Sequence, residues 1–214
     1  MKKFIFILFL LLALLPLCLQ AQTPSAEEPV STQQQEQKNE QDALAKQIQE
    51  RFEAVQTLSS RFVQEKHLVL LTEPVMAKGS FSFSKLTKQL RWEYTEPFQN
   101  GFLLDGKKHY RLENGAKIEM KTMLARNIAA QMMMWLSFDL KTLSETYQVQ
   151  YLETGVVLIP LSDKHALEKI TVFFDEKNPQ VLSQIRMDET NGDYTILRFE
   201  KTRINQPLAE GTFK

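Results

Sequence analysis

Cysteine is almost absent from this chain of 214 residues, and glycine and histidine are scarce. The one cysteine, Cys18, lies in an apolar N-terminal run, so the remaining chain has no thiol for a disulfide, a nucleophile or a thiolate metal site. Seven glycines, most of them in turn dipeptides, leave no phosphate-binding glycine loop. His67, His109 and His165 share no metal-ligand spacing, and we expect surface or strand-edge positions for them. We therefore predict no metal and no cofactor.

Neither positive nor negative charge is in excess, because the chain has 26 basic and 26 acidic residues. Because nucleic-acid binding needs a dense basic stripe, this balance argues against it. The G-x-S-x-G pattern of a nucleophile elbow is missing. Glu93 and Glu96 are a formal acid/base pair, but on an alternating strand Glu93 is the solvent-side neighbour of Trp92. We predict that the chain is not an enzyme.

Residues 1–21 have the pattern of a cleaved secretory signal peptide. Lys2 and Lys3 precede an apolar run from Phe4 to Leu19, and Ala21 ends a plausible cleavage site. An uncleaved anchor is the alternative, but a spanning helix needs roughly 20 apolar residues. Lipid attachment at Cys18 is a minor alternative, because Leu17 stands where a small residue is required. We expect an exported protein located in the periplasm.

Composition divides the rest of the chain into a tail and one domain. Residues 22–42 are rich in Gln, Glu, Pro and Ser and contain one valine and no aromatic residue. Such a segment buries too little apolar surface to offset the entropy of ordering, so it is predicted to be a disordered acidic tail. Residues 43–214 are nearly neutral and long enough for a single domain, which we expect to be monomeric.

The domain is predicted to begin with a helix and to continue as a meandering sheet. Leu44, Ile48, Phe52 and Val55 recur at helical spacing after Asp42, a plausible N-cap. Short alternating segments separated by turn dipeptides then predict antiparallel strands. These are Ser60–Leu70, Val75–Phe83, Gln89–Tyr94, Gly101–Leu104, Lys108–Leu112, Ala116–Met120, Gln148–Glu153, Val156–Pro160, Lys169–Asp175, Val181–Met187 and Tyr194–Lys201.

The segment from Gly79 to Gly106 combines strict alternation with aromatic side chains. Phe81 and Phe83 alternate with serines, and Leu90, Trp92 and Tyr94 alternate with charged or hydroxylated residues. Alternation with period two predicts a sheet with one face out of water. Without a catalytic set beside it, this face favours binding of an apolar molecule over its conversion.

Residues 122–147 interrupt the strands and are predicted to form one or two helices. The segment lacks Gly and Pro and contains the run Met132-Met133-Met134-Trp135-Leu136. Methionine side chains fill gaps in an ordinary core or line surfaces that accept variable apolar shapes. Two interpretations of this segment stay open: it is a packed element of the core, or it is a lid over the concave face of the sheet.

Several motifs follow one another along the chain: Phe62-Val63-Gln64, the strand starting at Gly79, Leu90-Arg91-Trp92-Glu93-Tyr94, Pro97, Asp105-Gly106-Lys107, Gly192-Asp193-Tyr194 and Phe213. In these motifs the chain resembles the LolA-type periplasmic carriers of outer-membrane lipoproteins. The resemblance implies a mainly β (α+β) fold, an open, incomplete antiparallel barrel of about eleven strands in which helices close the concave face as a lid. It also implies acylated lipoproteins as cargo, an inner-membrane ABC release complex as donor and an outer-membrane acceptor.

The resemblance and the alternation together yield a set of site residues. Leu90 and Trp92 match the family's cavity pair, and the predicted acyl-chain wall comprises Phe81, Phe83, Leu90, Trp92, Tyr94 and Leu103. The predicted lid comprises Leu44, Ile48, Phe52, Ile128, Met132, Met133, Trp135 and Leu136. Relatives commonly place Arg-Pro where this chain has Lys85-Leu86, so Lys85 is the candidate for the lid latch, as a point donor without the planar arginine fork.

Four other functions remain as alternatives to the lipoprotein carrier. A sensor would use the same half-barrel to detect lipids or lipoproteins, or the chain would carry another lipidic cargo. A lipid hydrolase would need a nucleophile and a base beside the cavity, and a structural envelope protein would have a packed core and no cavity.

Overall fold

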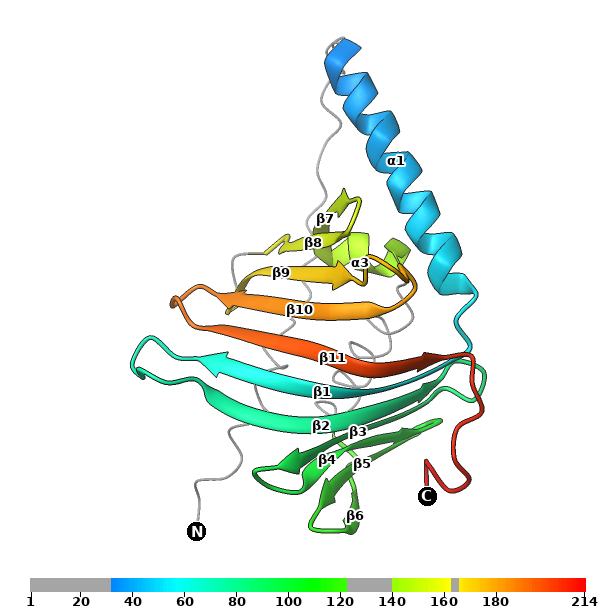
Figure 1. Cartoon of the computed structure of the whole chain (residues 1–214), viewed down its shortest axis with the longest axis vertical. Coiled ribbons are helices and arrows are strands. Elements are labelled where there is room, and N and C mark those ends of the chain that lie inside the picture. The colour runs from blue at the N-terminus through cyan, green and yellow to red at the C-terminus, as the bar shows by residue number, and fades with distance from the viewer. Residues whose placement is uncertain (1–31, 123–139, 163–165) are drawn as a thin grey trace.

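The computed structural model describes residues 32–122, 140–162 and 166–214. Their strands form one antiparallel sheet of eleven strands, in the order β6-β5-β4-β3-β2-β1-β11-β10-β9-β8-β7 (Figure 1). The strands are β1 Thr57–His67, β2 Val75–Ser84, β3 Gln89–Glu96, β4 Asn100–Asp105, β5 Lys108–Glu113, β6 Ala116–Glu119, β7 Tyr147–Leu152, β8 Gly155–Pro160, β9 Leu167–Phe174, β10 Leu182–Glu189 and β11 Tyr194–Ile204. The eleven predicted strands are thus confirmed, with shifts at their ends.

The order of the strands explains why the sheet is open. Each strand pairs with its neighbour in sequence, except that β1 pairs with β11 and so joins the two ends of the domain at the centre of the sheet. The outer strands β6 and β7 have no pairing with each other among the described residues, so the sheet does not close into a barrel. This agrees with the predicted open, incomplete barrel.

Two helices are described beside the sheet. α1 spans Thr32–Glu53 and α3 spans Leu140–Thr146, directly before β7. Figure 1 shows α1 on the side of the sheet where β7 lies. The prediction that the helix starts after Asp42 is wrong, because the helical backbone already includes residues 32–42. Gln, Glu and Lys lose little side-chain entropy in a helix, which makes this polar extension possible.

The start of the domain is joined to its end by one asparagine. Asn205 Oδ1 accepts hydrogen bonds from the amides of Gln56 at 2.7 Å and Thr57 at 3.4 Å, and Asn205 Nδ2 donates to the carbonyl of Ala54 at 2.9 Å. Asn205 has a positive φ of 54°, a conformation that asparagine tolerates well. The chain therefore leaves α1 and enters β1 along a path that β11 determines.

Candidate functional site: the inner face of the half-barrel

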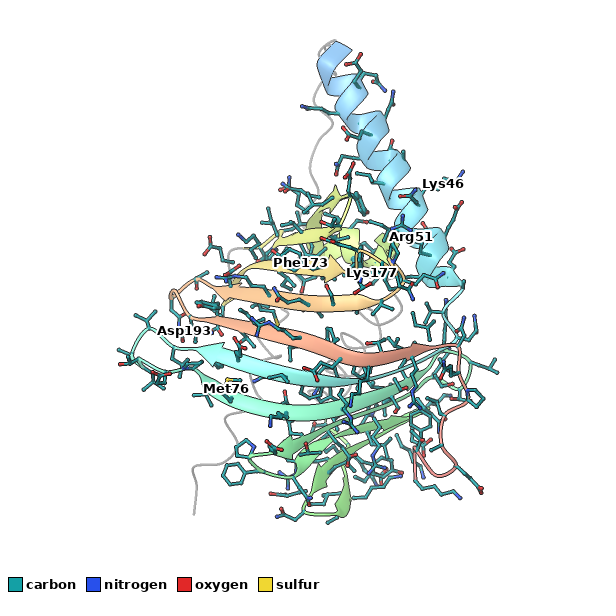
Figure 2. All side chains as sticks on the ribbon, viewed as in Figure 1. Lys46, Arg51, Met76, Phe173, Lys177 and Asp193 are labelled. Atoms are coloured by element: carbon teal, nitrogen blue, oxygen red, sulfur yellow. The ribbon has the colours of Figure 1, made fainter. Side chains whose placement is uncertain are left out.

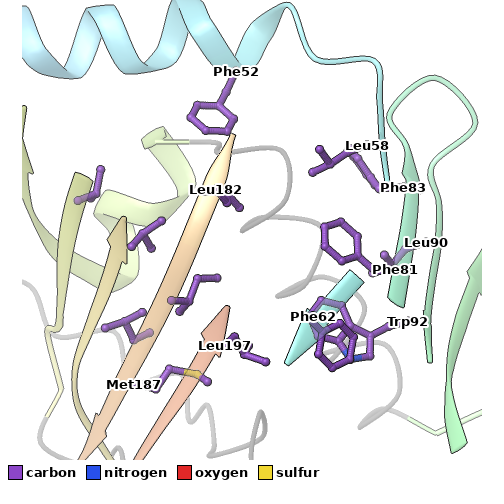
Figure 3. Close-up of a cluster of buried hydrophobic side chains, with 14 of the residues drawn as sticks. Phe52, Leu58, Phe62, Phe81, Phe83, Leu90, Trp92, Leu182, Met187 and Leu197 are labelled. Atoms are coloured by element: carbon purple, nitrogen blue, oxygen red, sulfur yellow. The ribbon is translucent and has the colours of Figure 1, made fainter. Parts of the chain in front are cut away.

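Alternation along the strands places one continuous set of apolar side chains on the inner face of the curved sheet (Figure 3). Residues opposite each other in neighbouring strands share a face, and the register pairs Phe81 with Trp92 and Phe83 with Leu90. The predicted residues Phe81, Phe83, Leu90, Trp92 and Tyr94 all lie in this set, and none is more than 6% exposed.

Three aromatic rings form a stack across β1, β2 and β3. The ring of Phe62 lies 4.5 Å from the ring of Trp92, centroid to centroid, and meets Tyr94 edge-on at 5.2 Å. The ring of Phe81 also stacks on Trp92, at 5.3 Å. Such pairs contribute to stability beyond the area they bury, so the stack helps to hold β1, β2 and β3 together.

Gly79 makes this stack possible. It lies between Phe62 of β1 and Tyr94 of β3 in the register, and a Cβ at its position would come within 2.4 Å of Phe62 Cζ. The missing side chain lets the ring of Phe62 extend over β2 to reach Trp92 and Tyr94. The glycine that starts the predicted aromatic segment therefore serves packing across the strand, not a turn.

Leu103 does not belong to the inner wall, contrary to the prediction. The register pairs it with Arg91, whereas Leu90 and Trp92 pair with Leu104 and Phe102. Leu103 is fully buried but lies on the outer face, outside the main apolar cluster. The run Phe102-Leu103-Leu104 is apolar throughout, so alternation could not tell which of its members points inward.

The second half of the sheet contributes an inner wall that the sequence prediction did not include. Ile185 pairs with both Val172 and Leu197, and Met187 pairs with Ile170. All five side chains are buried in the same cluster as the aromatic stack. Apolar residues alternate within β9 and β10, which is a usable signal, but the aromatic residues of these strands, Phe173 and Phe174, are adjacent and do not alternate.

A few polar groups are buried within this apolar wall. The hydroxyl of Tyr94 donates a hydrogen bond of 2.8 Å to Gln64 Oε1, and both residues are buried. Burial raises the pKa of Tyr94 to about 12, while the neighbouring Trp92 acts in the opposite direction. Trp92 Nε1 and Thr195 Oγ1 are also buried, and within the described part of the chain neither atom has a hydrogen-bond partner of good geometry.

The helix α1 covers one end of the inner face. Ile48 and Phe52 are buried, Leu44 is half-buried, and the ring of Phe52 lies 5.4 Å from that of Phe174 in β9. These three are the predicted lid residues of the first helix, and their side chains lie on the apolar stripe as expected. Whether they open stays a prediction. The other predicted lid residues, Ile128, Met132, Met133, Trp135 and Leu136, lie outside the described residues.

The candidate latch, Lys85, contacts the end of α1. Its Nζ donates to the carbonyl oxygen of Glu53 at 3.2 Å, and its backbone amide donates to Gln56 at 2.8 Å. A cation at a helix C-terminus satisfies an otherwise unpaired carbonyl and interacts favourably with the helix dipole. The turn between β2 and β3 is therefore tied to the helix, although the role of this bond as a latch stays a prediction.

The carboxylates considered as an acid/base pair are engaged elsewhere. Both oxygens of Glu93 accept hydrogen bonds from Arg91, at 2.7 and 2.8 Å, and Glu96 pairs with Lys78 at 2.8 Å. Arg91 also donates to the carbonyls of Thr212 and Lys214, so the C-terminal segment lies against the outer face. A shallow pocket of about 380 Å³ lies between them and is lined by Ser80, Phe81, Ser82, Arg91, Glu93 and residues 209–212.

The described residues hold no group of three or more His, Cys, Asp or Glu side chains placed to bind a metal ion. No helix among them is long and apolar enough to cross a membrane.

The sequence matches a family model over residues 53–214, described as the outer membrane lipoprotein carrier protein LolA. The chain belongs to the LolA family. The match begins at the last residue of α1 and includes every strand of the sheet, so it contains both halves of the inner wall. The family is described by its carrier role, not by an enzymatic one. No curated protein sequence shows significant similarity to this LolA family member.

Solved structures share the fold at low sequence identity. The MucA/MucB complex of Pseudomonas aeruginosa matches with a TM-score of 0.51 and 11% identity, covering 82% of this chain and 60% of that chain. A structure of MucB alone gives 0.52 and 11%, covering 82% and 62%. A LolA superfamily protein of Nitrosomonas europaea gives 0.45 and 11%, covering 79% and 97%. The chain thus spans about three fifths of the length of the MucB chains.

Proposed function

We propose that this LolA family member is a periplasmic carrier that binds the acyl chains of lipoproteins against the inner face of its half-barrel. The observation that carries the proposal is the continuous apolar wall on one face of an open sheet, with Phe81, Trp92 and Leu104 at its centre. In the proposed cycle an inner-membrane ABC complex delivers the cargo, and an outer-membrane acceptor receives it. The predicted signal peptide supports the periplasmic location.

The packing of the empty protein supports a moderate affinity, as a carrier requires. Each acyl CH₂ removed from water contributes about 0.8 kcal/mol, so an acyl chain in an open trough would be held too tightly to leave. Here the wall residues are already buried, with Phe83 and Leu90 at 0% exposure. An acyl chain must therefore replace contacts between side chains of the protein, and the loss of those contacts offsets part of the binding free energy.

The proposal is tested by incubating the purified protein with spheroplasts that synthesise lipoproteins. We expect newly made lipoproteins in the soluble fraction. If none appears while an established carrier releases them in parallel, the carrier proposal is wrong. Binding of acyl probes without release would instead support a sensor or a carrier of other lipidic cargo.

Two neighbouring leucines provide a matched test of the binding face. Leu104 lies on the inner face and Leu103 on the outer face, and both are buried. Replacing either by alanine should cost about 2–5 kcal/mol of stability. Only Leu104→Ala should weaken binding of a fluorescent acyl probe, by about tenfold, because a buried leucine contributes about 1.5–3 kcal/mol of apolar contact. Equal affinities in the two variants, measured where both are folded, would contradict binding on this face.

A further inference from the structure

One end of the sheet carries most of the exposed apolar side chains of the described residues. Ten large hydrophobic residues are exposed in the described part of the chain, and seven of these ten lie at that end. We name these seven the apolar rim: Val69, Leu70, Leu71, Val75, Met76, Phe98 and Leu161. The other three are Leu86, Ile118 and Leu152.

The register shows that the rim residues share one end although they are far apart in sequence. β1 ends at His67 and β2 begins at Val75, so residues 68–74 connect them at this end. β3 ends there too, since Glu96 pairs with Lys78, and Phe98 follows it. β9 begins there, where Leu167 pairs with Glu189, and Leu161 belongs to the connection that leads into it. Figure 2 shows Met76 and Asp193 at this end.

The most exposed part of the rim is held in place by hydrogen bonds. The amide of Val69 donates to Asp193 Oδ1 at 2.8 Å, and the amide of Leu71 donates to the carbonyl of Leu68 at 2.9 Å. Asp193 is itself fixed by Asn191, whose Nδ2 donates to Asp193 Oδ2 at 3.0 Å. Leu70 is left 94% exposed at the tip. Exposed aliphatic side chains on an ordered turn indicate a contact that the described residues do not themselves supply.

The charges behind the rim are neutralised within the protein. Lys66 pairs with Glu189 at 3.6 Å, Lys78 with Glu96 at 2.8 Å, and Arg186 with Asp188 at 2.8 Å. Neither sign is left in excess among these three pairs. The exposed Glu73, in the connection between β1 and β2, is acidic and would not attract an anionic surface.

An aromatic and cationic layer lies directly behind the tip. The ring of Tyr194 stacks on His67 at 4.3 Å, and the guanidinium of Arg186 lies 4.1 Å from the centre of the same ring. Aliphatic groups at the tip, followed by tyrosine and then by a cation, match the order of environments from the acyl region of a bilayer to its headgroups.

We propose that the apolar rim is a membrane-contacting surface, with Leu70 and its neighbours inserting into the outer layer of a lipid bilayer. The rim residues lie in or beside three separate connections between strands. A planar and deformable lipid surface can contact all three connections at once. Because three nearby pairs of charges neutralise each other and the exposed Glu73 is acidic, the contact depends on apolar insertion and not on anionic lipid.

The test compares two exposed leucines at opposite ends of the sheet. Leu70 is 94% exposed at the rim, and Leu86 is 85% exposed in the turn between β2 and β3. The protein, purified in the form the cell processes, is mixed with phosphatidylcholine vesicles and floated on a density gradient. We expect the wild type and Leu86→Glu to float with the vesicles and Leu70→Glu to bind at least about tenfold more weakly. Neither substitution should change stability, since both side chains are in water.

The remaining outcomes separate the alternatives. Equal flotation of Leu70→Glu and wild type, or no flotation of the wild type, overturns the proposal. So does binding that requires phosphatidylglycerol in the vesicles, which would indicate attraction by charge. If light scattering shows a dimer that Leu70→Glu dissociates and the wild type does not float, the rim contacts a second copy instead. Acyl-probe binding without vesicles should be the same in all three proteins, which keeps this test independent of the carrier proposal.

Discussion

The hydroxyl of Tyr94 donates a 2.8 Å hydrogen bond to Gln64 Oε1, in the middle of an otherwise apolar wall. The bond joins β3 to β1 across the intervening strand β2. Burial raises the pKa of Tyr94 to about 12, so the hydroxyl keeps its proton and remains a donor at any physiological pH. A buried pair of this kind is fully satisfied only when both partners keep this orientation, which restricts how the two strands lie.

Because this pKa is raised in the folded protein, the free energy of unfolding should decrease at alkaline pH. Below about pH 10 the tyrosine is protonated in both the folded and the unfolded chain, so its contribution is complete. Between about pH 10 and 12 the unfolded chain loses the proton first, and stability should fall by up to about 2–3 kcal/mol. Urea unfolding across this range should show a shallower decline for Tyr94→Phe than for the wild type. Parallel declines would mean that Tyr94 is not the group responsible.

One glutamine of α1 makes two hydrogen bonds to the edge of the sheet. Gln41 Nε2 donates to the carbonyl of Tyr151 at 3.0 Å, and the amide of Tyr151 donates to Gln41 Oε1 at 2.8 Å. The side chain thus continues the hydrogen bonding of the edge strand β7. Gln41→Ala should cost about 1–2 kcal/mol and speed hydrogen exchange at the amide of Tyr151.

A glutamine two turns further along the helix is the matched control. Gln49 makes only a hydrogen bond to Glu53 of the same helix, at 2.9 Å on the surface. Gln49→Ala should cost no more than about 0.5 kcal/mol and leave exchange at Tyr151 unchanged. The same exchange rate in both variants would show that the Gln41 contact does not hold the helix on the sheet.

The C-terminal segment should detach when Arg91 is replaced. Its guanidinium donates to the carbonyls of Thr212, at 3.2 Å, and Lys214, at 2.8 Å. Arg91→Ala removes both bonds, so we expect carboxypeptidase to trim the end of the chain on the order of tenfold faster. Arg111→Ala is the control, because Arg111 pairs with Glu113 at 2.9 Å. Trimming at the same rate in both variants would contradict the assigned contact.

The local parts of the fold could be predicted because they depend on local pattern. Alternation from Phe81 to Tyr94 specified which side chains share a face, and dipeptides such as Asp105-Gly106 specified where a hairpin turns. The errors occurred where the pattern was ambiguous. Leu103 lies within three consecutive apolar residues and was assigned to the wrong face. The pattern predicts a first strand that continues to Leu70, whereas β1 ends at His67 and Val69 and Leu70 belong to the apolar rim.

Composition also misled at the start of the helix. Residues 32–42 have no apolar stripe, yet the helix continues through them as far as Thr32. Gln41, which the composition assigned to a tail, makes the two hydrogen bonds to β7. Polar pairing with a backbone far away in sequence has no periodic signal, so no pattern in the sequence could reveal it.

By itself the sequence determined the eleven strands, the alternating aromatic wall and the family, because side-chain period and turn chemistry act over a few residues. Only the tertiary structure decided that β1 pairs with β11 and that Phe62 crosses Gly79 to reach Trp92. It likewise decided that Leu70 and Leu161 share one end of the sheet. Each of these relationships joins residues distant in the chain, and their contacts exist only once the whole sheet has assembled.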